Sequence, residues 1–227
     1  MQDIVIVGAG GFAREVAWLI EDINLKNNLW NLIGYIDENL SNKGCLLNGN
    51  EVLGNFDSIK WGNENIYYIC AVGDTLVRKE LSEKAESIGL KPAILIHPNV
   101  IMSKYVKVGE GTIICSSNTI TVNVEIGKHV IINLDCTIGH DVLIQDYVTI
   151  LPSVNVSGSV ILEDGSSIGT GSAIIQGKRV GINSIIGAGT VVVKDVPANC
   201  TAVGVPAKVV KYHNAINFNR ELRVVRS

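Results

Sequence analysis

An unbroken repeat of six residues runs from Met102 to Ala198 and limits what this chain can fold into. One position of the repeat is apolar in all 17 units, at Met102, Val108, Ile114, Ile120, Ile126, Ile132, Ile138, Ile144, Ile150, Val156, Leu162, Ile168, Ile174, Val180, Ile186, Val192 and Ala198. Four residues later stands a small or β-branched residue, with Asn118 and Lys178 as exceptions. A period of six matches neither the 3.6-residue period of a helix nor the two-residue period of an isolated strand. The repeat therefore predicts short strands separated by tight corners.

Fixed repeats of this kind are typical of solenoids, and a repeat of six is typical of a β-helix. One coil cannot bury its aliphatic side chains alone, whereas coils stacked about 4.8 Å apart form a continuous core. We expect glycine to supply the corner conformations that β-branched residues cannot adopt. The relevant glycines follow the aliphatic position, at Gly109, Gly127, Gly139, Gly169, Gly181 and Gly187. The Val, Ile, Thr and Gly content disfavours a helical segment, and the regular spacing disfavours a sandwich.

The repeat resembles that of the left-handed β-helix acyltransferases of the hexapeptide-repeat family. The resemblance implies triangular coils of three repeats each, so that residues 18 apart stack, and it also implies the left-handed winding. We expect this parallel β-helix domain over residues 92–211, followed by a C-terminal tail over residues 212–227.

Residues 1–91 are expected to form a Rossmann-like βαβαβ domain. A buried strand over residues 2–9 leads into a glycine-rich turn and then a helical pattern, which is the layout of a nucleotide-binding site. Further strands are expected at residues 32–36 and 67–72. The domain is too short for a full dinucleotide fold, and the alternative is a glycine turn that only packs helix on strand. The candidate substrate-binding residues are Gly8, Gly10, Gly11, Phe12, Asp37, Glu38, Gly73 and Asp74.

Three segments of this domain, "IVIVGAGGFAREVA", "GYIDE" and "AVGDTLVRKEL", resemble the N-terminal domain of bacterial sugar-nucleotide acetyltransferases. That group includes proteins similar to sialic acid O-acetyltransferases. The resemblance implies a nucleotide-linked sugar as the substrate of this domain. In these relatives the first motif commonly reads GGHA, and Phe12 stands here in place of its histidine.

His140 stands at a corner position outside the aliphatic core, and Asp141 follows it. Histidine can accept and return a proton near neutral pH, and a neighbouring carboxylate can fix its tautomer. The segment from Asn133 to Asp141 resembles a family motif that runs from Asn-Thr-Gly to Glu-His-Asp. The resemblance implies His140 as general base, Asp141 as its orienting carboxylate and Asn133 as a contact near the thioester. Without the resemblance, a solvated corner histidine is the alternative.

The later coils are expected to hold acetyl-CoA. Backbone N–H groups near Gly158, one coil after His140, are expected to stabilise the oxyanion of acyl transfer. The segment "DVPANCTAVGVPAKVVK" resembles the closing signature of hexapeptide acetyltransferases. Some relatives carry a second histidine nine positions after the base, where this chain has Thr149. The implied CoA contacts are Thr149, Gly158, Thr170, Ala188, Lys194 and Lys208; for the lysines, solvated surface charges are the alternative.

The composition excludes several classes of function. A net charge of −3 gives no reason to expect a nucleic-acid or anionic-membrane partner. Five scattered cysteines without a CxxC pattern indicate a reducing compartment, so we expect a cytoplasmic protein. No apolar stretch approaches the length of a membrane span. Zinc needs three or four well-placed ligands, so the four dispersed histidines predict no metal centre.

These observations predict a homotrimeric acetyltransferase that moves an acetyl group from acetyl-CoA to the amine of a nucleotide-linked amino sugar in polysaccharide biosynthesis. The trimer is implied by the resemblance, with the acceptor and CoA bound between neighbouring β-helices. Two alternatives stay open. One is O-acetylation of a sugar or sialic acid hydroxyl, and the other is a non-catalytic nucleotide-binding trimeric scaffold.

Overall fold

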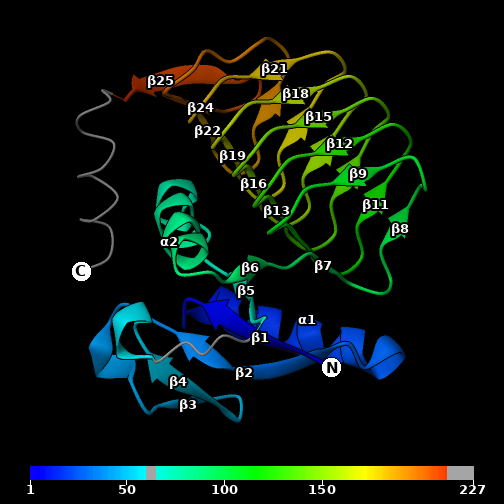
Figure 1. Cartoon of the computed structure of the whole chain (residues 1–227). Helices are drawn as coiled ribbons and strands as arrows, with labels where there is room; N and C mark the ends of the chain where they lie inside the picture. Colours follow the sequence, from blue (N-terminus) through cyan, green and yellow to red (C-terminus); the bar gives the residue numbers. More distant parts are fainter. Residues whose placement is uncertain (60–64, 214–227) are drawn as a thin grey trace.

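The computed structural model describes residues 1–59 and 65–213, which form an N-terminal α/β part and a long parallel β-helix (Figure 1). This confirms the predicted fold class, a Rossmann-like α/β domain followed by a left-handed parallel β-helix. Within the described residues, no helix has the length and apolar character needed to cross a bilayer. Residues 214–227 of the predicted tail lie outside the described residues.

The N-terminal sheet has six strands in the order β3-β4-β2-β1-β5-β6. All neighbours run parallel except β3, which pairs antiparallel with β4. Residues 4–7 of the central strand are at most 1% exposed, as their apolar sequence predicts. The strands are β1 (Gln2–Val7), β2 (Trp30–Ile36), β3 (Leu46–Leu47), β4 (Asn50–Gly54), β5 (Tyr67–Cys70) and β6 (Lys91–Pro92).

Two α-helices cover opposite faces of this sheet. Helix α1 packs Ile20 in the same apolar cluster as Ile4, whereas α2 packs Ala85 in the cluster of Val5 on the other face. The alternation of side chains along β1 explains this division. The helices are α1 (Gly11–Asn27) and α2 (Thr75–Ser87), with 3₁₀ turns η1 (Leu40–Asn42) and η2 (Phe56–Ser58).

The β-helix is a triangular prism with three sheets, which we call faces 1, 2 and 3. Face 1 contains β7 (Leu95–Ile96), β10 (Ile113–Ile114), β13 (Ile131–Ile132), β16 (Thr149–Ile150), β19 (Ser167–Ile168), β22 (Ile185–Ile186), β24 (Cys200–Val203) and the antiparallel β25 (Lys208–Tyr212). Face 2 contains β8 (Ile101–Met102), β11 (Thr119–Ile120), β14 (Thr137–Ile138), β17 (Asn155–Val156), β20 (Ala173–Ile174) and β23 (Val191–Val192). Face 3 contains β9 (Lys107–Val108), β12 (Glu125–Ile126), β15 (Leu143–Ile144), β18 (Ile161–Leu162) and β21 (Arg179–Val180).

The aliphatic position of the repeat fills the interior of the prism, and residues 18 apart pair as expected. The repeat differs from the prediction at its end. Ile186 pairs with Ala202, 16 residues later, and Val180 bridges to Val196, also 16 residues later. Ala198 is therefore exposed and lies outside the core, whereas Ala202 is 1% exposed.

The glycines after the aliphatic position serve a different purpose from the expected one. Gly139, for example, is not among the residues with positive φ, but a Cβ there would lie 2.6 Å from the backbone nitrogen of Gly158 in the next coil. Positive φ occurs two residues further on, as at Asp141 with φ of 58°. These glycines permit close stacking of coils, and the corners themselves use Asn, Asp, Ser, Gly and others.

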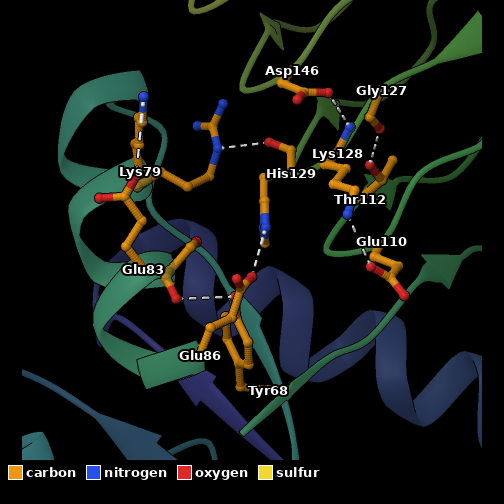
Figure 2. A network of polar contacts seen from close by, with 12 residues as sticks. Tyr68, Lys79, Glu83, Glu86, Glu110, Thr112, Gly127, Lys128, His129 and Asp146 are labelled. Carbon is orange, nitrogen blue, oxygen red and sulfur yellow. Dashed lines mark hydrogen bonds and ion pairs between the residues drawn. The ribbon is translucent and has the colours of Figure 1, made fainter. Parts of the chain in front are cut away.

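The N-terminal part docks on face 1 and on the corner between faces 3 and 1. The ring of His129, which is 2% exposed, stacks with the rings of Tyr68 and Tyr147. Figure 2 shows His129 beside Tyr68 and Glu86. His129 Nε2 lies 3.1 Å from Glu86 Oε1, and the hydroxyl of Tyr68 donates to the same oxygen at 2.9 Å. Arg78 Nε donates to the carbonyl oxygen of His129 at 2.9 Å. This junction therefore combines aromatic stacking with charged hydrogen bonds.

The junction should make stability depend on pH. Burial lowers the pKa of His129, although Glu86 opposes this effect. The unfolded chain takes up a proton near pH 6.5 that the folded chain resists, so stability is complete above about pH 6.5 and is lost below it, by at most about 1.4 kcal/mol per pH unit. The variant His129→Phe keeps a ring between Tyr68 and Tyr147. We expect its melting temperature to fall less steeply than that of the wild type between about pH 7.5 and 5.5; equal slopes would contradict this assignment.

Candidate active site

His140 and Asp141 form a hydrogen-bonded pair at the corner between β14 and β15. His140 Nδ1 lies 2.8 Å from Asp141 Oδ2, and the two side chains are 51% and 52% exposed. Because an ionised carboxylate only accepts hydrogen bonds, the proton belongs on Nδ1 and the lone pair on Nε2. Hydrogen bonds from His140 and Asn123 hold the pKa of Asp141 below its usual range. The pair can therefore accept a proton at Nε2 and stabilise the imidazolium that results.

Asn123 is a member of this cluster that the sequence interpretation missed. Its Nδ2 donates to Asp141 Oδ1 at 3.1 Å from one coil earlier, 18 residues before Asp141. Asn123 and Asp141 both have positive φ, 57° and 58°, which Asn and Asp tolerate better than most residues. The stacking of residues 18 apart was the signal that could have identified Asn123.

Gly158 lies beside the imidazole of His140. A Cβ at this position would be 2.4 Å from His140 Nε2, so glycine leaves room for the ring. The flanking N–H groups of Ser157 and Ser159 donate to the carbonyl oxygens of Ile174 and His140. The N–H of Gly158 has no acceptor within residues 1–59 and 65–213. The corner thus places the backbone of Gly158 beside the ring nitrogen of His140 that carries the lone pair.

His140 begins a column of corner residues along the β-helix. The strands of face 2 stack in register at Ile138, Val156, Ile174 and Val192. Two residues beyond each strand stand His140, Gly158, Gln176 and Lys194, and the last two are exposed. Coils stack about 4.8 Å apart, so Lys194 lies about 14 Å along the column from His140. The column runs from the candidate base to a cation.

Other predicted residues stand at a different corner. Asn133, Thr170 and Ala188 follow strands of face 1 and lie between faces 1 and 2, where Thr170 and Ala188 are exposed. The side-chain oxygen of Asn133 accepts the N–H of Leu134 at 2.7 Å. Within one chain, these residues and His140 lie at opposite edges of face 2. Lys208 is exposed in β25, at the end of the β-helix.

Thr149 lies at the domain junction rather than on an open surface. It is 2% exposed, and its hydroxyl donates to the carbonyl oxygen of Gly73 at 3.0 Å. The structure gives this hydroxyl a partner within the chain because β16 faces the loop between β5 and α2. Within this chain the Thr149 hydroxyl is therefore engaged at the domain junction, whereas the sequence predicted it as a CoA contact.

A cavity of about 600 Å³ opens at the carboxyl ends of β1, β2 and β5, where ligands of parallel α/β sheets bind. Helix α1 begins at Gly11, and its N-cap residue Gly10 offers no side-chain acceptor. The first N–H groups of α1 are therefore available to an anion. The cavity gathers seven of the predicted substrate-binding residues: Gly8, Gly10, Gly11, Phe12, Asp37, Glu38 and Gly73.

Three acidic residues line this cavity, and the sequence interpretation missed one of them, Glu80 on α2. The carboxylate of Asp37 is held in place by the N–H of Asn39 at 2.8 Å. Glu38 pairs with Lys84 at 3.2 Å. Carboxylates accept hydrogen bonds, so this side of the cavity suits the N–H and O–H donors of a base or a ribose.

Asp74, the eighth predicted residue, has a structural position instead. Its Oδ1 accepts the N–H groups of Leu76 and Val77 at 3.1 and 3.0 Å, which makes it the N-cap of α2. Asp74 is not part of the cavity lining. An Asp before an apolar helical pattern is a usual capping signal. Among the residues that the structure describes, no group of three or more His, Cys, Asp and Glu is placed to hold a metal ion.

Comparisons with known proteins agree with this geometry. Residues 3–85 match the model of the PglD N-terminal domain. The chain is 34% identical over 213 residues to GDP-perosamine N-acetyltransferase of Escherichia coli O157:H7, covering 91% of this chain and 95% of the relative. It belongs to the hexapeptide-repeat sugar N-acetyltransferases. By this membership the chain is an acetyl-CoA-dependent acetyltransferase.

Two solved structures of this family resemble the chain over nearly its whole length. A histidine variant of perosamine N-acetyltransferase from Caulobacter crescentus, in complex with CoA and GDP-perosamine, has a TM-score of 0.86 and 27% identity, covering 93% of this chain and 98% of that one. The acetyltransferase domain of PglB from Neisseria gonorrhoeae FA1090, in complex with acetyl coenzyme A, has a TM-score of 0.81 and 29% identity, covering 92% and 99%. The family assignment therefore extends over both parts of the chain.

Proposed function

We propose that this sugar N-acetyltransferase moves the acetyl group of acetyl-CoA to the amine of a nucleotide-linked amino sugar, with His140 as general base. The observation that carries the proposal is the His140–Asp141 pair at 2.8 Å, whose Nε2 faces Gly158. A GDP-linked amino sugar is the first acceptor to test, because the relative that is 34% identical is a GDP-perosamine N-acetyltransferase.

The chemistry follows from the positions of these atoms. The sugar amine attacks the thioester carbonyl carbon as Nε2 of His140 takes up its proton, and Asp141 stabilises the imidazolium. The N–H of Gly158 donates to the oxyanion of the tetrahedral intermediate. Collapse of the intermediate breaks the C–S bond, and the departing CoA sulfur takes the proton from His140. Amide and CoA thiol leave, and no covalent enzyme intermediate forms.

The two substrates are proposed to bind in different parts of the chain. The cavity at the carboxyl ends of β1, β2 and β5 is proposed to hold the nucleotide, with its phosphates at Gly10 and Gly11. The column that ends in Lys194 is proposed to hold the pantetheine arm of CoA, with a phosphate of CoA near the lysine. Thr170, Ala188 and Lys208 are proposed to contact CoA from elsewhere on the late coils, and Asn133 to lie near the thioester.

We further propose that the enzyme is a homotrimer. His140 stands at the corner between faces 2 and 3, whereas the N-terminal part docks at the corner between faces 3 and 1 and on face 1. An acceptor held in the cavity of one chain would therefore meet His140 of a neighbouring chain. Light scattering of the purified protein should give three times the mass of one chain. The cytoplasmic location and the domain boundaries at residues 91 and 211 stay predictions.

An acceptor panel tests this function. Purified protein is incubated with acetyl-CoA and with GDP-, UDP- and dTDP-linked amino sugars, and CoA thiol release and product mass are measured. Each amino sugar is matched by the nucleotide sugar that carries a hydroxyl in place of the amine. We expect turnover with an amino sugar and none with its hydroxyl counterpart. Turnover only with hydroxyl acceptors would indicate O-acetylation, and the absence of CoA binding would indicate a scaffold.

A further inference from the structure

Helix α2 connects the proposed nucleotide cavity to the β-helix through two of its faces. One face contributes Val77, Glu80 and Leu81 to the cavity lining. The other face carries Arg78, which is completely buried at the junction. It also carries Glu86, which contacts His129 (Figure 2). A shift of α2 against the coils would therefore also change the shape of the cavity.

Arg78 links the wall of the cavity to the corner between faces 3 and 1. Its Nη1 donates to Val72 at 2.9 Å and to Gly73 at 3.1 Å, both of which line the cavity. On the β-helix side, its Nη2 donates to the carbonyl oxygen of Tyr147 at 2.6 Å. The acceptors are the carbonyl oxygens of Val72, Gly73, His129, Tyr147 and Val148. Burial lowers the pKa of Arg78 to about 10, which still leaves a cation at neutral pH.

Gly73 receives a second hydrogen bond from the β-helix. The hydroxyl of Thr149 in β16 donates to the Gly73 carbonyl oxygen at 3.0 Å. This carbonyl is thus held by Arg78 from its own domain and by Thr149 from the coils. Neither side chain lines the cavity, so neither contacts a ligand bound there. Both act on the segment Val72–Gly73, which forms one wall of the cavity.

We propose that Arg78 and Thr149 are positioning residues for the nucleotide sugar. They fix the Val72–Gly73 wall against the β-helix and so set where the cavity presents its sugar relative to the coils. The inference rests on the proposed role of the cavity as the nucleotide site. Removing one donor leaves the wall attached but less constrained, so the change should affect the nucleotide sugar and spare acetyl-CoA, whose proposed column lies at another corner.

Thr149 allows a clean test, because Thr149→Val removes the hydroxyl at almost constant volume. We expect the KM for the nucleotide sugar and the Kd for GDP alone to rise about threefold to tenfold, the usual range for one lost hydrogen bond. The KM for acetyl-CoA should stay within about twofold of the wild type. Thr149→Ser, which keeps the hydroxyl, should restore tight binding of the nucleotide sugar. Arg78→Lys should raise the same KM further if the variant folds.

A second readout keeps this test independent of the proposed function. Amide hydrogen exchange of the Val72–Gly73 segment should be faster in Thr149→Val than in the wild type and in Thr149→Ser, whatever the cavity binds. Unchanged exchange, or equal rises in KM for both substrates, would overturn the positioning role. Faster exchange together with an enzyme that accepts no nucleotide sugar would show that Thr149 constrains the Val72–Gly73 wall, but it would reject the proposed function and with it the positioning of a nucleotide sugar.

Discussion

Replacing His140 by asparagine is expected to lower kcat for acetyl transfer by about 10²- to 10⁴-fold, the range that general acid–base catalysis contributes. Asparagine is polar and of similar size, but it cannot take the proton of the attacking amine. The side chain of His140 is half exposed, so its replacement should leave the core of the coils intact. The loss should therefore fall on kcat, with the KM for both substrates and the melting temperature near their wild-type values. Steady-state kinetics with varied acetyl-CoA and varied acceptor measure this.

A matched variant, Asp141→Asn, and a binding measurement on His140→Asn test this explanation further. Asp141→Asn keeps the shape of the side chain and removes its charge, so His140 loses the partner that holds its tautomer. We expect a smaller loss of kcat than in His140→Asn. Calorimetry should show that His140→Asn still binds CoA. Turnover of His140→Asn at the wild-type rate would remove His140 from the mechanism, whatever its position.

The stacking of the β-helix was predictable because one periodic signal specifies it, whereas its left-handed winding was implied only by the resemblance. The aliphatic position of each repeat points into the prism, and a single register of 18 residues places all three faces. The prediction failed where that signal stops being the main constraint. At the last coil, Val180 bridges to Val196 and the coil is two residues shorter, although Ala198 still fits the apolar pattern. An alanine satisfies such a pattern whether it is buried or exposed.

The hairpin β3–β4 is an omission for which the sequence does carry a signal. Asn48 and Gly49 both have positive φ, 48° and 82°, and connect the two short strands. An Asn-Gly pair is a local indication of a two-residue hairpin turn, and here it follows Leu46 and Leu47 and is followed by the polar Asn50 and Glu51 before Val52. The long interval between the second and third predicted strands should therefore have been read as containing a hairpin.

The candidate site was predictable only in part, because sequence motifs identify chemical groups and not their partners. His140 and Asp141 are adjacent in sequence, and the structure brings them into contact. Asn123 required the stacking rule, whereas the contact between Arg78 and Tyr147 joins residues 69 apart. Nothing in the local sequence around Arg78 indicates a buried cation. Such contacts form only where the two domains pack against each other, and the six-residue repeat does not predict how they pack.

Replacing Gly158 by alanine should lower kcat by about 10²-fold while leaving the fold intact, since a misplacement near 1 Å can have an effect of this size. An added Cβ would lie 2.4 Å from His140 Nε2, and the half-exposed imidazole can swing away to relieve the contact. Gly158 is absent from the residues with positive φ, so alanine fits its backbone. Stability should thus be spared, as a melting curve would show, while the base moves from its position.

The double variant His140→Asn with Gly158→Ala separates this explanation from a general disturbance of the corner. If Gly158→Ala acts by displacing the imidazole, adding it to His140→Asn should reduce kcat little further, because the displaced group is already missing. Fully multiplicative losses would instead mean that Gly158 acts through its own N–H or through the substrate. Wild-type activity in Gly158→Ala would show that Nε2 of His140 does not work from the position it has beside this glycine.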